Sequence, residues 1–460
     1  MLITFVILYL AVTVLIGIAA ARFIRGSGDF ILAGRKLPLL VNAAALFALW
    51  FGSETVFGAT SEFIQHGFMG IIEDPFGGAL CLMLYAVFLA RPLYRMNLLT
   101  LGDLYRNRYG KTVELTAALC MITTFFGYIA AQLVAMGILL NLIVEIPLYY
   151  GILLSAGVVT LYTVVGGMWA ISVTDFFQSI LIVTGLIAAA AAITAQAGGV
   201  MPVIRSAPEG FFNIIPEMTP AGLSEYLAAW VTLGLGSLAS QDIFQRANAA
   251  SSVTNAVRSA YLGALLYLGV SMIPLFIALA ARKLYPEILT DDNQQILPLM
   301  VMKHTSLPVQ ILFFGALLSA ILSTASGALL APATILTENV IRPLARKRLD
   351  ERHFLLFLRF SVVLIAAISA GMAVGRRNIY QLVGESYILG LVSLLVPLVA
   401  AVYWSKAKPA GAMLSMIMGL LSWVVFEFFI NPGMPALIPA FLLSIAAMLA
   451  GSLVHIKTSK

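Results

Sequence analysis

The stretch LWFGSETVFGATSEF, residues 49–63, decides how the rest of the chain is interpreted. It lies inside an apolar run from Leu37 to about Ile64, which is long enough to cross a bilayer. A carboxylate at that depth costs about 2.5–3.5 kcal/mol on insertion scales, so we expect Glu54 to have an interaction partner or a functional role. The surrounding glycines and hydroxyls favour a helix that breaks and turns free backbone groups toward a cavity. A glycine-kinked span with a buried, protonated Glu54 is the simpler alternative.

The composition restricts the chain to one broad class of protein. It has 460 residues, of which 61% are hydrophobic and only 10% are charged. This balance excludes a soluble domain and indicates a polytopic, all-α membrane protein. Cys81 and Cys120 both lie in apolar runs, so no disulfide framework is expected. The net charge of +6 does not indicate nucleic-acid binding, because the basic residues fall between the apolar runs.

Hydropathy predicts about thirteen transmembrane helices in a single domain, 1–460. They are expected near 2–22, 39–65, 71–93, 113–143, 148–167, 173–196, 223–246, 258–281, 304–337, 354–375, 379–403, 409–430 and 434–454. With the N-terminus outside, most of the 27 basic residues fall in inner segments. The six exceptions are Arg205, Arg282, Lys283, Lys303, Arg376 and Arg377. This bias predicts a cytoplasmic C-terminus, and we expect an integral protein of a bacterial inner (plasma) membrane.

A second interrupted stretch, GLGSLASQDIFQR at 234–246, lies in the predicted seventh span. The second and seventh spans lie five spans apart and would cross the membrane in opposite directions. This spacing predicts a 5+5 inverted repeat, with spans two to six (about 39–196) and seven to eleven (about 223–430) as its halves. Each half would begin with a discontinuous helix, and a solute site would lie between them at the midplane. Coincidence is the alternative, because glycine is common in membrane helices.

The motif LSTASG, residues 322–327, is the sharpest signal for an ion. Consecutive hydroxyls on one helix can give oxygen ligands to a small hard cation, and carbonyls of a nearby broken helix can complete the shell. Taken alone, Ser and Thr in a membrane helix more often bond back to their own backbone.

Five stretches together resemble the sodium:solute symporter family, which has the inverted-repeat fold of the bacterial leucine transporter. They are DFILAGRKLP (29–38), the run at 49–63, YTVVGGMWAISVTDFFQ (162–178), SQDIFQRANAASS (240–252) and LSTASGALLAPATILTENVI (322–341). The glycine pair in the third stretch is expected to make a tight inner turn between two spans. The broken-helix region looks closest to the choline-transporting branch, which also has a tryptophan just before its broken segment.

The resemblance implies a sodium site and a path by which sodium leaves it. Backbone carbonyls of Ala48, Phe51 and Ala320 and the hydroxyls of Ser323 and Thr324 would bind the ion. Asp175 matches the acidic residue on the inner exit path. A helix N-terminal carboxylate satisfied by the helix dipole is a compatible interpretation of Asp175. The resemblance implies sodium as the coupling ion, and no other metal and no cofactor is expected.

The resemblance also implies a substrate site. It would be lined by Trp50, Ser53, Glu54, Thr55, Asp74, Gly234, Gly236, Ser237, Gly384 and Glu385. The aromatic gate of the sugar-transporting branch is glycine and serine here, and the proline branch has an aspartate where Trp50 stands. From the residues themselves, three carboxylates (Glu54, Asp74 and Glu385) with no mid-span cation suit an amine, a quaternary ammonium or a zwitterion. Carboxylates, nucleobases and vitamins stay open.

The sequence therefore predicts a sodium-coupled symporter that imports a small organic solute by alternating access. Its partners would be the solute, sodium and the lipid bilayer, without nucleic acid, and its oligomeric state is open. A membrane sensor that keeps the symporter fold as an input module is the rival. An enzyme is not expected, because the four histidines fall near span ends or in loops and no nucleophile–base pair appears. They are His66, His304, His353 and His455.

The predicted topology can be tested by labelling single cysteines in intact cells. Cysteines placed at Glu209 and Asp291 should react with an impermeant thiol reagent added outside, because both positions are predicted to lie in outer loops. A cysteine at Lys347 should stay unlabelled until the membrane is permeabilised. Labelling at 347 in intact cells contradicts the orientation.

Overall fold

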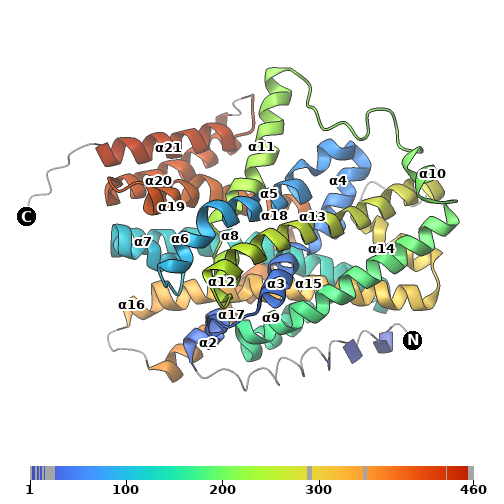
Figure 1. Cartoon of the computed structure of the whole chain (residues 1–460), viewed down its shortest axis with the longest axis horizontal. Helices are drawn as coiled ribbons and strands as arrows, with labels where there is room; N and C mark the ends of the chain where they lie inside the picture. The colour runs from blue at the N-terminus through green and yellow to red at the C-terminus, as the bar shows by residue number, and fades with distance from the viewer. Residues whose placement is uncertain are drawn as a thin grey trace, which may run out of the picture.

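The computed structural model describes residues 26–286, 293–345, 350–430 and 433–453, together with 3–5, 8–9, 11–12 and 15. Most of the predicted first span, 2–22, lies outside these residues, as do Asp291 and Lys347. The regular structure of the described chain is helical, and an isolated bridge joins Leu37 to Ala250. Most helices run along the long axis of the molecule (Figure 1).

Within the described residues, the first half of the chain contains nine helices and several short helical turns. The helices are α2 (Ser27–Leu32), α3 (Leu39–Trp50), α4 (Ala59–His66), α5 (Gly78–Leu84), α6 (Ala90–Arg95), α7 (Leu101–Tyr109), α8 (Lys111–Val144), α9 (Leu148–Gln196) and α10 (Val200–Ile204). The short turns are η1 (Ala33–Arg35), η2 (Glu54–Gly58), η3 (Gly67–Ile71), η4 (Ile72–Gly77) and η5 (Tyr85–Leu89).

The second half contains α11 to α21. They are α11 (Pro220–Gly236), α12 (Gln241–Ala249), α13 (Val253–Leu284), α14 (Ile296–His304), α15 (Leu307–Ile335), α16 (Arg342–Leu344), α17 (Glu351–Gly375), α18 (Ile379–Gly390), α19 (Val396–Tyr403), α20 (Pro409–Val425) and α21 (Leu437–Leu453). The short turns here are η6 (Ser237–Ala239), η8 (Asn293–Gln295), η9 (Leu336–Ile341), η10 (Leu391–Leu395) and η11 (Phe426–Ile430).

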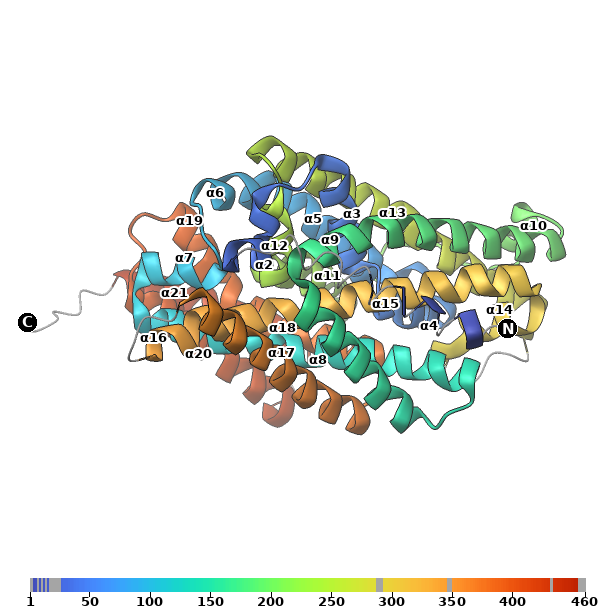
Figure 2. The same ribbon diagram turned by 90° about the horizontal axis from the view of Figure 1, so that it is seen from below.

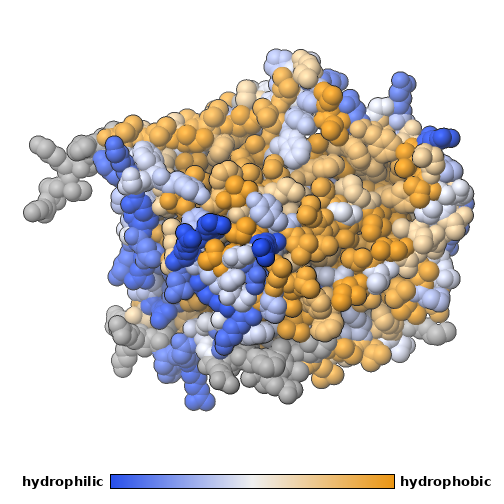
Figure 3. Space-filling view, in the orientation of Figure 1, coloured by the Kyte–Doolittle hydropathy of each residue, from blue (hydrophilic) through white to orange (hydrophobic). Residues whose placement is uncertain are grey.

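Eight stretches of the described chain are long and apolar enough to cross a membrane. The count of about thirteen is not reproduced, partly because adjacent predicted spans form one continuous stretch. Residues Glu54–Arg95 join the end of the predicted second span to the third, and α9 contains the fifth and sixth. The helices α3 and α21 are apolar but shorter. Hydrophobic residues cover most of one face, and hydrophilic ones gather mainly at the end that carries α2, α7 and α16 (Figure 3).

The helix that starts at Leu39 breaks where the sequence predicted. Its regular part, α3, ends at Trp50, and Phe51 has φ −78° and ψ 78°, outside the helical region. The chain becomes helical again at Glu54. Gly52 allows this break, because a Cβ there would lie 2.9 Å from both Gln132 Oε1 on α8 and Thr324 Oγ1 on α15.

A second break separates α11 from α12. The turn η6 follows Gly236, and Ser240 is extended, with φ −83° and ψ 133°. The start of the first broken helix meets the end of the second at an isolated parallel bridge between Leu37 and Ala250. The Leu37 N–H donates to Ala249 O at 3.0 Å, and the Ser251 N–H donates to Leu37 O at 3.0 Å.

The core is built around α15, which lies lengthwise through the middle of the molecule (Figures 1 and 2). Every residue from Phe313 to Ile335 is buried, and α9 and α8 are among the helices that pack on it. The hairpin of α20 and α21 packs chiefly on itself at one edge of the molecule (Figure 1). The helix that carries LSTASG is thus enclosed by protein and not by lipid.

The predicted turn at the glycine pair is confirmed at Gly167. This residue interrupts α9 with φ 54° and ψ −163°, a conformation that side chains with a Cβ rarely adopt. A Cβ at Gly167 would also lie 2.9 Å from the Phe30 ring and 3.0 Å from Phe30 O on α2. The turn divides α9 into two helical segments, and α2 packs against the turn at Phe30.

We therefore expect Gly167→Ala to lower the free energy of unfolding by about 1–3 kcal/mol, because it adds backbone strain to a close contact. Gly157→Ala is the matched control. Gly157 lies on the same helix, and a Cβ there would meet nothing within 4 Å. Thermal unfolding of the purified variants in detergent measures the difference, and equal midpoints for the two variants would contradict this account of the turn.

Candidate functional site

Three oxygen atoms converge where the first broken helix meets α15. Thr324 Oγ1 donates to Ala48 O at 2.9 Å and lies 3.5 Å from Phe51 O. The break makes this approach possible, because the Gly52 N–H bonds to Trp50 O at 2.9 Å and leaves Ala48 O free of its usual helical partner. All three residues are buried. Such a cluster of backbone and hydroxyl oxygens has the chemistry that a small hard cation requires.

The other two predicted sodium ligands lie on the same helix. Ala320 is one turn before Thr324 on α15, so both face the same side of that helix. The Ser323 hydroxyl instead donates to Asp175 Oδ1 on α9, at 2.5 Å. Asp175 therefore contacts Ser323, the residue that directly precedes Thr324 of the oxygen cluster.

Glu54 is held by neutral donors in the middle of the protein. Its side chain is only 1% exposed. Gln132 Nε2 donates to Oε2 at 2.9 Å, and the Tyr128 hydroxyl lies 3.3 Å from Oε1 and 2.8 Å from Leu49 O. The Ser53 hydroxyl is 3.4 Å from Oε2. Tyr128 and Gln132 are one turn apart on α8 and therefore share a face.

Asp74, in η4, is the second carboxylate of this centre and is 2% exposed. Thr55 Oγ1 donates to Oδ2 at 3.0 Å, and the Tyr267 hydroxyl on α13 donates to Oδ1. The Thr55 and Tyr267 hydroxyls are 2.8 Å apart. Among the described residues, no cationic side chain lies within 4 Å of Asp74 or Glu54.

Aromatic rings surround these two carboxylates. The Trp50 ring stacks on Tyr387 of α18, with centroids 5.7 Å apart, and lies 6.2 Å from Tyr267. The Tyr128 ring is 5.7 Å from Tyr387. Sequence reasoning named only Trp50 of these four. Tyr128, Tyr267 and Tyr387 are polar aromatic residues inside otherwise apolar spans, a signal that could have indicated them.

The structure does not bring Glu385 to this centre, which corrects the charge argument made from sequence. Arg376 holds both carboxylate oxygens of Glu385 at 2.5 Å, and the Glu385 side chain is 31% exposed. The short connection between α17 and α18 places these two residues side by side, so the acid is already neutralised. Two carboxylates, not three, remain for a solute.

The predicted glycines lie around the centre and not in one place. Gly384 faces Glu73, since a Cβ there would lie 3.2 Å from Glu73 Oε1. Gly234 packs on Leu80, and Gly236 packs on the backbone of Tyr387. Ser237 lines a small cavity with Tyr128 and Tyr387, of about 20 Å³, which holds about one water molecule. The centre is therefore closed in this conformation.

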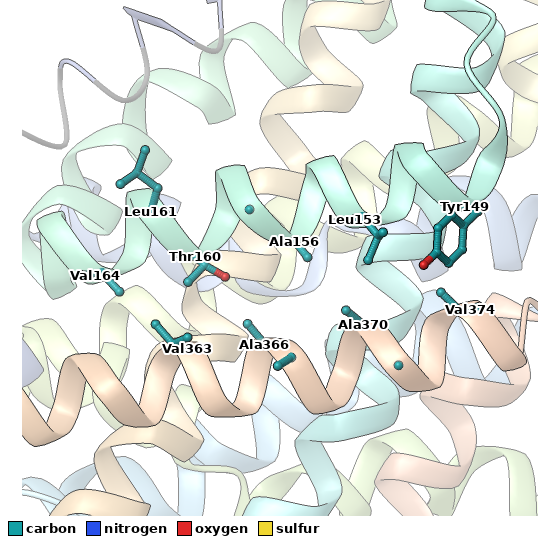
Figure 4. A pocket seen from close by; sticks show the side chains of 13 residues that line it. Tyr149, Leu153, Ala156, Thr160, Leu161, Val164, Val363, Ala366, Ala370 and Val374 are labelled. Atoms are coloured by element: carbon teal, nitrogen blue, oxygen red, sulfur yellow. The ribbon is translucent and has the colours of Figure 1, made fainter.

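A long apolar groove on the surface is chemically unsuited to a charged solute. It measures about 780 Å³ and runs between the first helical segment of α9 and α17 (Figure 4). Alanine and valine side chains of the two helices face each other across it, and Thr160 and Tyr149 are the only polar ones among the described residues that line it (Figure 4). Leu153 and Leu161 are exposed, as expected for a surface that contacts lipid.

Comparison with known proteins gives the same family that the motifs suggest. The human high affinity choline transporter 1 is 26% identical over 445 residues, 91% of this chain and 75% of that protein. The high-affinity proline transporter PutP of Bacillus subtilis (strain 168) is 25% identical over 458 residues, 94% of each chain. The structure of a Na⁺-coupled sialic acid symporter superposes with a TM-score of 0.85 at 16% identity, covering 98% of this chain and 97% of that one.

The family model described as SSF, sodium:solute symporter family, matches residues 30–419, which include both helix breaks and the oxygen cluster. This chain belongs to the sodium:solute symporter family.

Proposed function

We propose that this protein couples the inward movement of sodium to the import of a small organic solute with a positively charged nitrogen. An amine, a quaternary ammonium or a zwitterionic amino acid fits this description. The observation that supports it most is the pairing of two sites on one broken helix. Ala48 and Phe51 present oxygens to Thr324 on one side of the break, and Trp50 and Glu54 line the carboxylate centre on the other.

Sodium is proposed to bind between the break and α15. Its ligands are the carbonyl oxygens of Ala48, Phe51 and Ala320 and the hydroxyl oxygens of Ser323 and Thr324. Each of these groups is uncharged, which suits a monovalent cation that must bind and leave in every cycle. The bound ion ties α15 to the broken helix and so favours the conformation that is open to the outside. Because the coupling is a free energy between two sites, bound solute must raise sodium affinity by the same factor.

The solute is proposed to bind between the aromatic rings and the two carboxylates. Trp50 and three tyrosines offer ring faces, and Glu54 and Asp74 have no cation within 4 Å among the described residues. A ring cage with adjacent negative charge is the recognised environment for ammonium groups. Choline and proline, named for the two relatives above, both carry a cationic nitrogen, which agrees with this chemistry.

Two buried polar groups indicate that the solute also carries an oxygen. Trp50 Nε1 and Ser237 Oγ are buried and have no hydrogen-bond partner within the described part of the chain. A buried donor left without a partner costs about 1–3 kcal/mol, so such groups are usually satisfied by a ligand or water. A hydroxyl or carboxylate oxygen on the solute would accept from them. Glu385 is left out of this site because it pairs with Arg376.

The membrane arrangement is part of the proposal. Spans two to six and seven to eleven would form two inverted halves of one domain, each led by a broken helix, and the presence of a helix break after both α3 and α11 supports this. The end with α2, α7 and α16, where hydrophilic residues gather (Figure 3), faces the cytoplasm, and the N-terminus lies outside.

Two alternatives make different predictions. A membrane sensor would bind solute and sodium without moving either across the membrane, so uptake into sealed proteoliposomes separates it from a symporter. A symporter for carboxylates, nucleobases or vitamins would bind those solutes in preference to amines. The carboxylate centre disfavours an anion, since it would add a third negative charge to a site with no cation near it.

The sodium site is tested with Thr324. We expect Thr324→Ala to raise the sodium concentration at half-maximal uptake roughly tenfold or more, because a lost interaction with a charged group costs about 1.5–3 kcal/mol. Thr324→Ser keeps the hydroxyl and should stay close to the wild type. Sodium titrations of uptake into proteoliposomes measure both variants. An unchanged sodium requirement in Thr324→Ala would exclude this site.

The solute site is tested with Trp50 and Glu54. We expect Trp50→Ala to weaken solute binding by about 0.5–2 kcal/mol, the usual cation–π contribution, and Glu54→Gln to weaken it further by removing the charge. Sodium binding should change little in either variant. Thermal stabilisation by choline, betaine and proline, compared with sugars and plain carboxylates, gives the measurement.

Glu385→Gln is the matched control for this test, because its carboxylate is paired with Arg376 away from the rings. It should bind amines like the wild type. A wild-type protein that is stabilised by a sugar or an anion, and not by any amine, would contradict the proposed solute class and leave the sodium site standing.

A further inference from the structure

Arg246 on α12 is a fully buried arginine beside the proposed sodium path. Its Nη2 lies 3.6 Å from Oδ2 of Asp175, longer than the bond of a strong arginine–carboxylate pair. Within the described part of the chain, neither the three guanidinium nitrogens nor Asp175 Oδ2 has a hydrogen-bond partner. Charge attraction and packing therefore hold Arg246 near Asp175, without the bidentate hydrogen bonds of a strong arginine–carboxylate pair.

Asp175 is the counter-charge of this arginine. A guanidinium stays charged under all physiological conditions, so its burial must be compensated by a nearby anion. Among the described residues, Asp175 is the only carboxylate within 4 Å. Asp242, one turn away on α12, is bound to Ser240 Oγ at 2.5 Å and to the Ile243 N–H at 2.8 Å. Both contacts use Asp242 Oδ1 in the first turn of α12, and among the described residues Asp242 lies more than 4 Å from the guanidinium nitrogens of Arg246.

The guanidinium also fills a space that α15 leaves for it. A Cβ on Gly327 would overlap the guanidinium nitrogens of Arg246. The absent side chain at 327 thus lets Arg246 fasten α12 against α15 and α9. In the proposed orientation, this contact lies on the cytoplasmic side of the second helix break.

The same carboxylate also faces the sodium site. Asp175 Oδ1 accepts a hydrogen bond from Ser323 at 2.5 Å, and the next residue, Thr324, reaches Ala48 O. Sodium that leaves the Thr324 oxygens toward the cytoplasm thus meets a carboxylate whose charge already neutralises Arg246. One carboxylate in a buried site cannot compensate two cations.

We propose that Arg246 is a tethered cation that competes with the transported sodium ion for Asp175. While sodium is absent from Asp175, the Arg246 charge is compensated and α12 stays closed against α15. When sodium moves onto Asp175, Arg246 loses its counter-charge and moves with α12 toward water, which opens the cytoplasmic path. This inference rests on the proposed sodium site, and it assigns to Arg246 the coupling of ion release to inner opening.

The test is the sodium dependence of thermal stability in purified protein. Competition predicts that Arg246→Gln, which removes the charge but keeps a long polar side chain, lowers the sodium concentration at half-maximal stabilisation by about fivefold or more. Arg246→Lys retains the charge and should stay near the wild type. Arg108→Gln is the control for loss of an inner arginine, since Arg108 contacts the backbone oxygens of Trp404 and Ser405 and the Tyr109 ring, away from the proposed sodium path.

A merely structural arginine gives the opposite result, because its loss would weaken sodium binding or leave it unchanged. Either outcome in folded Arg246→Gln overturns the proposal, as does an Arg246→Lys variant that behaves like Arg246→Gln. Should Arg246→Gln fail to fold, Gly327→Ala decides. It displaces the guanidinium while keeping its charge, and the sodium midpoint should again fall.

The pair is tested separately with Asp175. Asp175→Asn leaves Arg246 buried and uncompensated, so the protein should lose stability without sodium, and adding Arg246→Gln should restore much of that loss. Additive losses would overturn the pairing. A wild-type protein that shows no sodium-dependent stabilisation at all would instead refute the proposed sodium site itself.

Discussion

The structure depends on one interruption of backbone hydrogen bonding, between Trp50 and Glu54. In a membrane, a carbonyl without a partner is costly, so a broken helix persists only where the protein itself satisfies the freed groups. Here the Thr324 hydroxyl donates a hydrogen bond to Ala48 O, and the Ser53 N–H donates to Gln132 Oε1 at 3.0 Å. Gly52 makes both contacts possible, because a Cβ would separate the break from α8 and α15. The oxygens that would bind sodium are a direct consequence of that break.

The carboxylates inside the protein also have their hydrogen bonds or their charge satisfied by nearby protein groups. Glu54 and Asp74 are surrounded by amide and hydroxyl donors, Glu385 is paired with Arg376, and Asp175 faces Arg246. Neutral donors satisfy a carboxylate's hydrogen bonds without cancelling its charge. In the proposed solute site, the two acids beside the rings would therefore keep a negative potential for a solute, whereas Glu385 would not. Position in the fold, and not residue type, decides which acid is available.

The sequence was sufficient for the features that have a local cause. Glycine and hydroxyl residues inside an apolar run predicted the break at residues 51–53, and the glycine pair predicted the turn at Gly167. Features that arise from contacts between distant segments were missed. Tyr128, Tyr267 and Tyr387 come from three different helices, and nothing in their neighbours marks them as one cage. Arg246 looked like an inner-loop residue, because hydropathy cannot show that Gly327, eighty-one positions later, leaves room for a guanidinium.

The shared helix break gives a physical reason for coupling that needs no long pathway. Gln132 accepts from the Ser53 N–H and donates to Glu54, so one amide side chain fixes both the backbone at the break and the carboxylate of the cage. In the proposed mechanism, an ion that draws Ala48 and Phe51 toward Thr324 would reorient residues 51–53 and move Glu54 with them. A cation placed against Glu54 and Trp50 would restrain the same residues from the other side. Each ligand would thereby lower the conformational cost that the other must meet, which is the reciprocity that linkage requires.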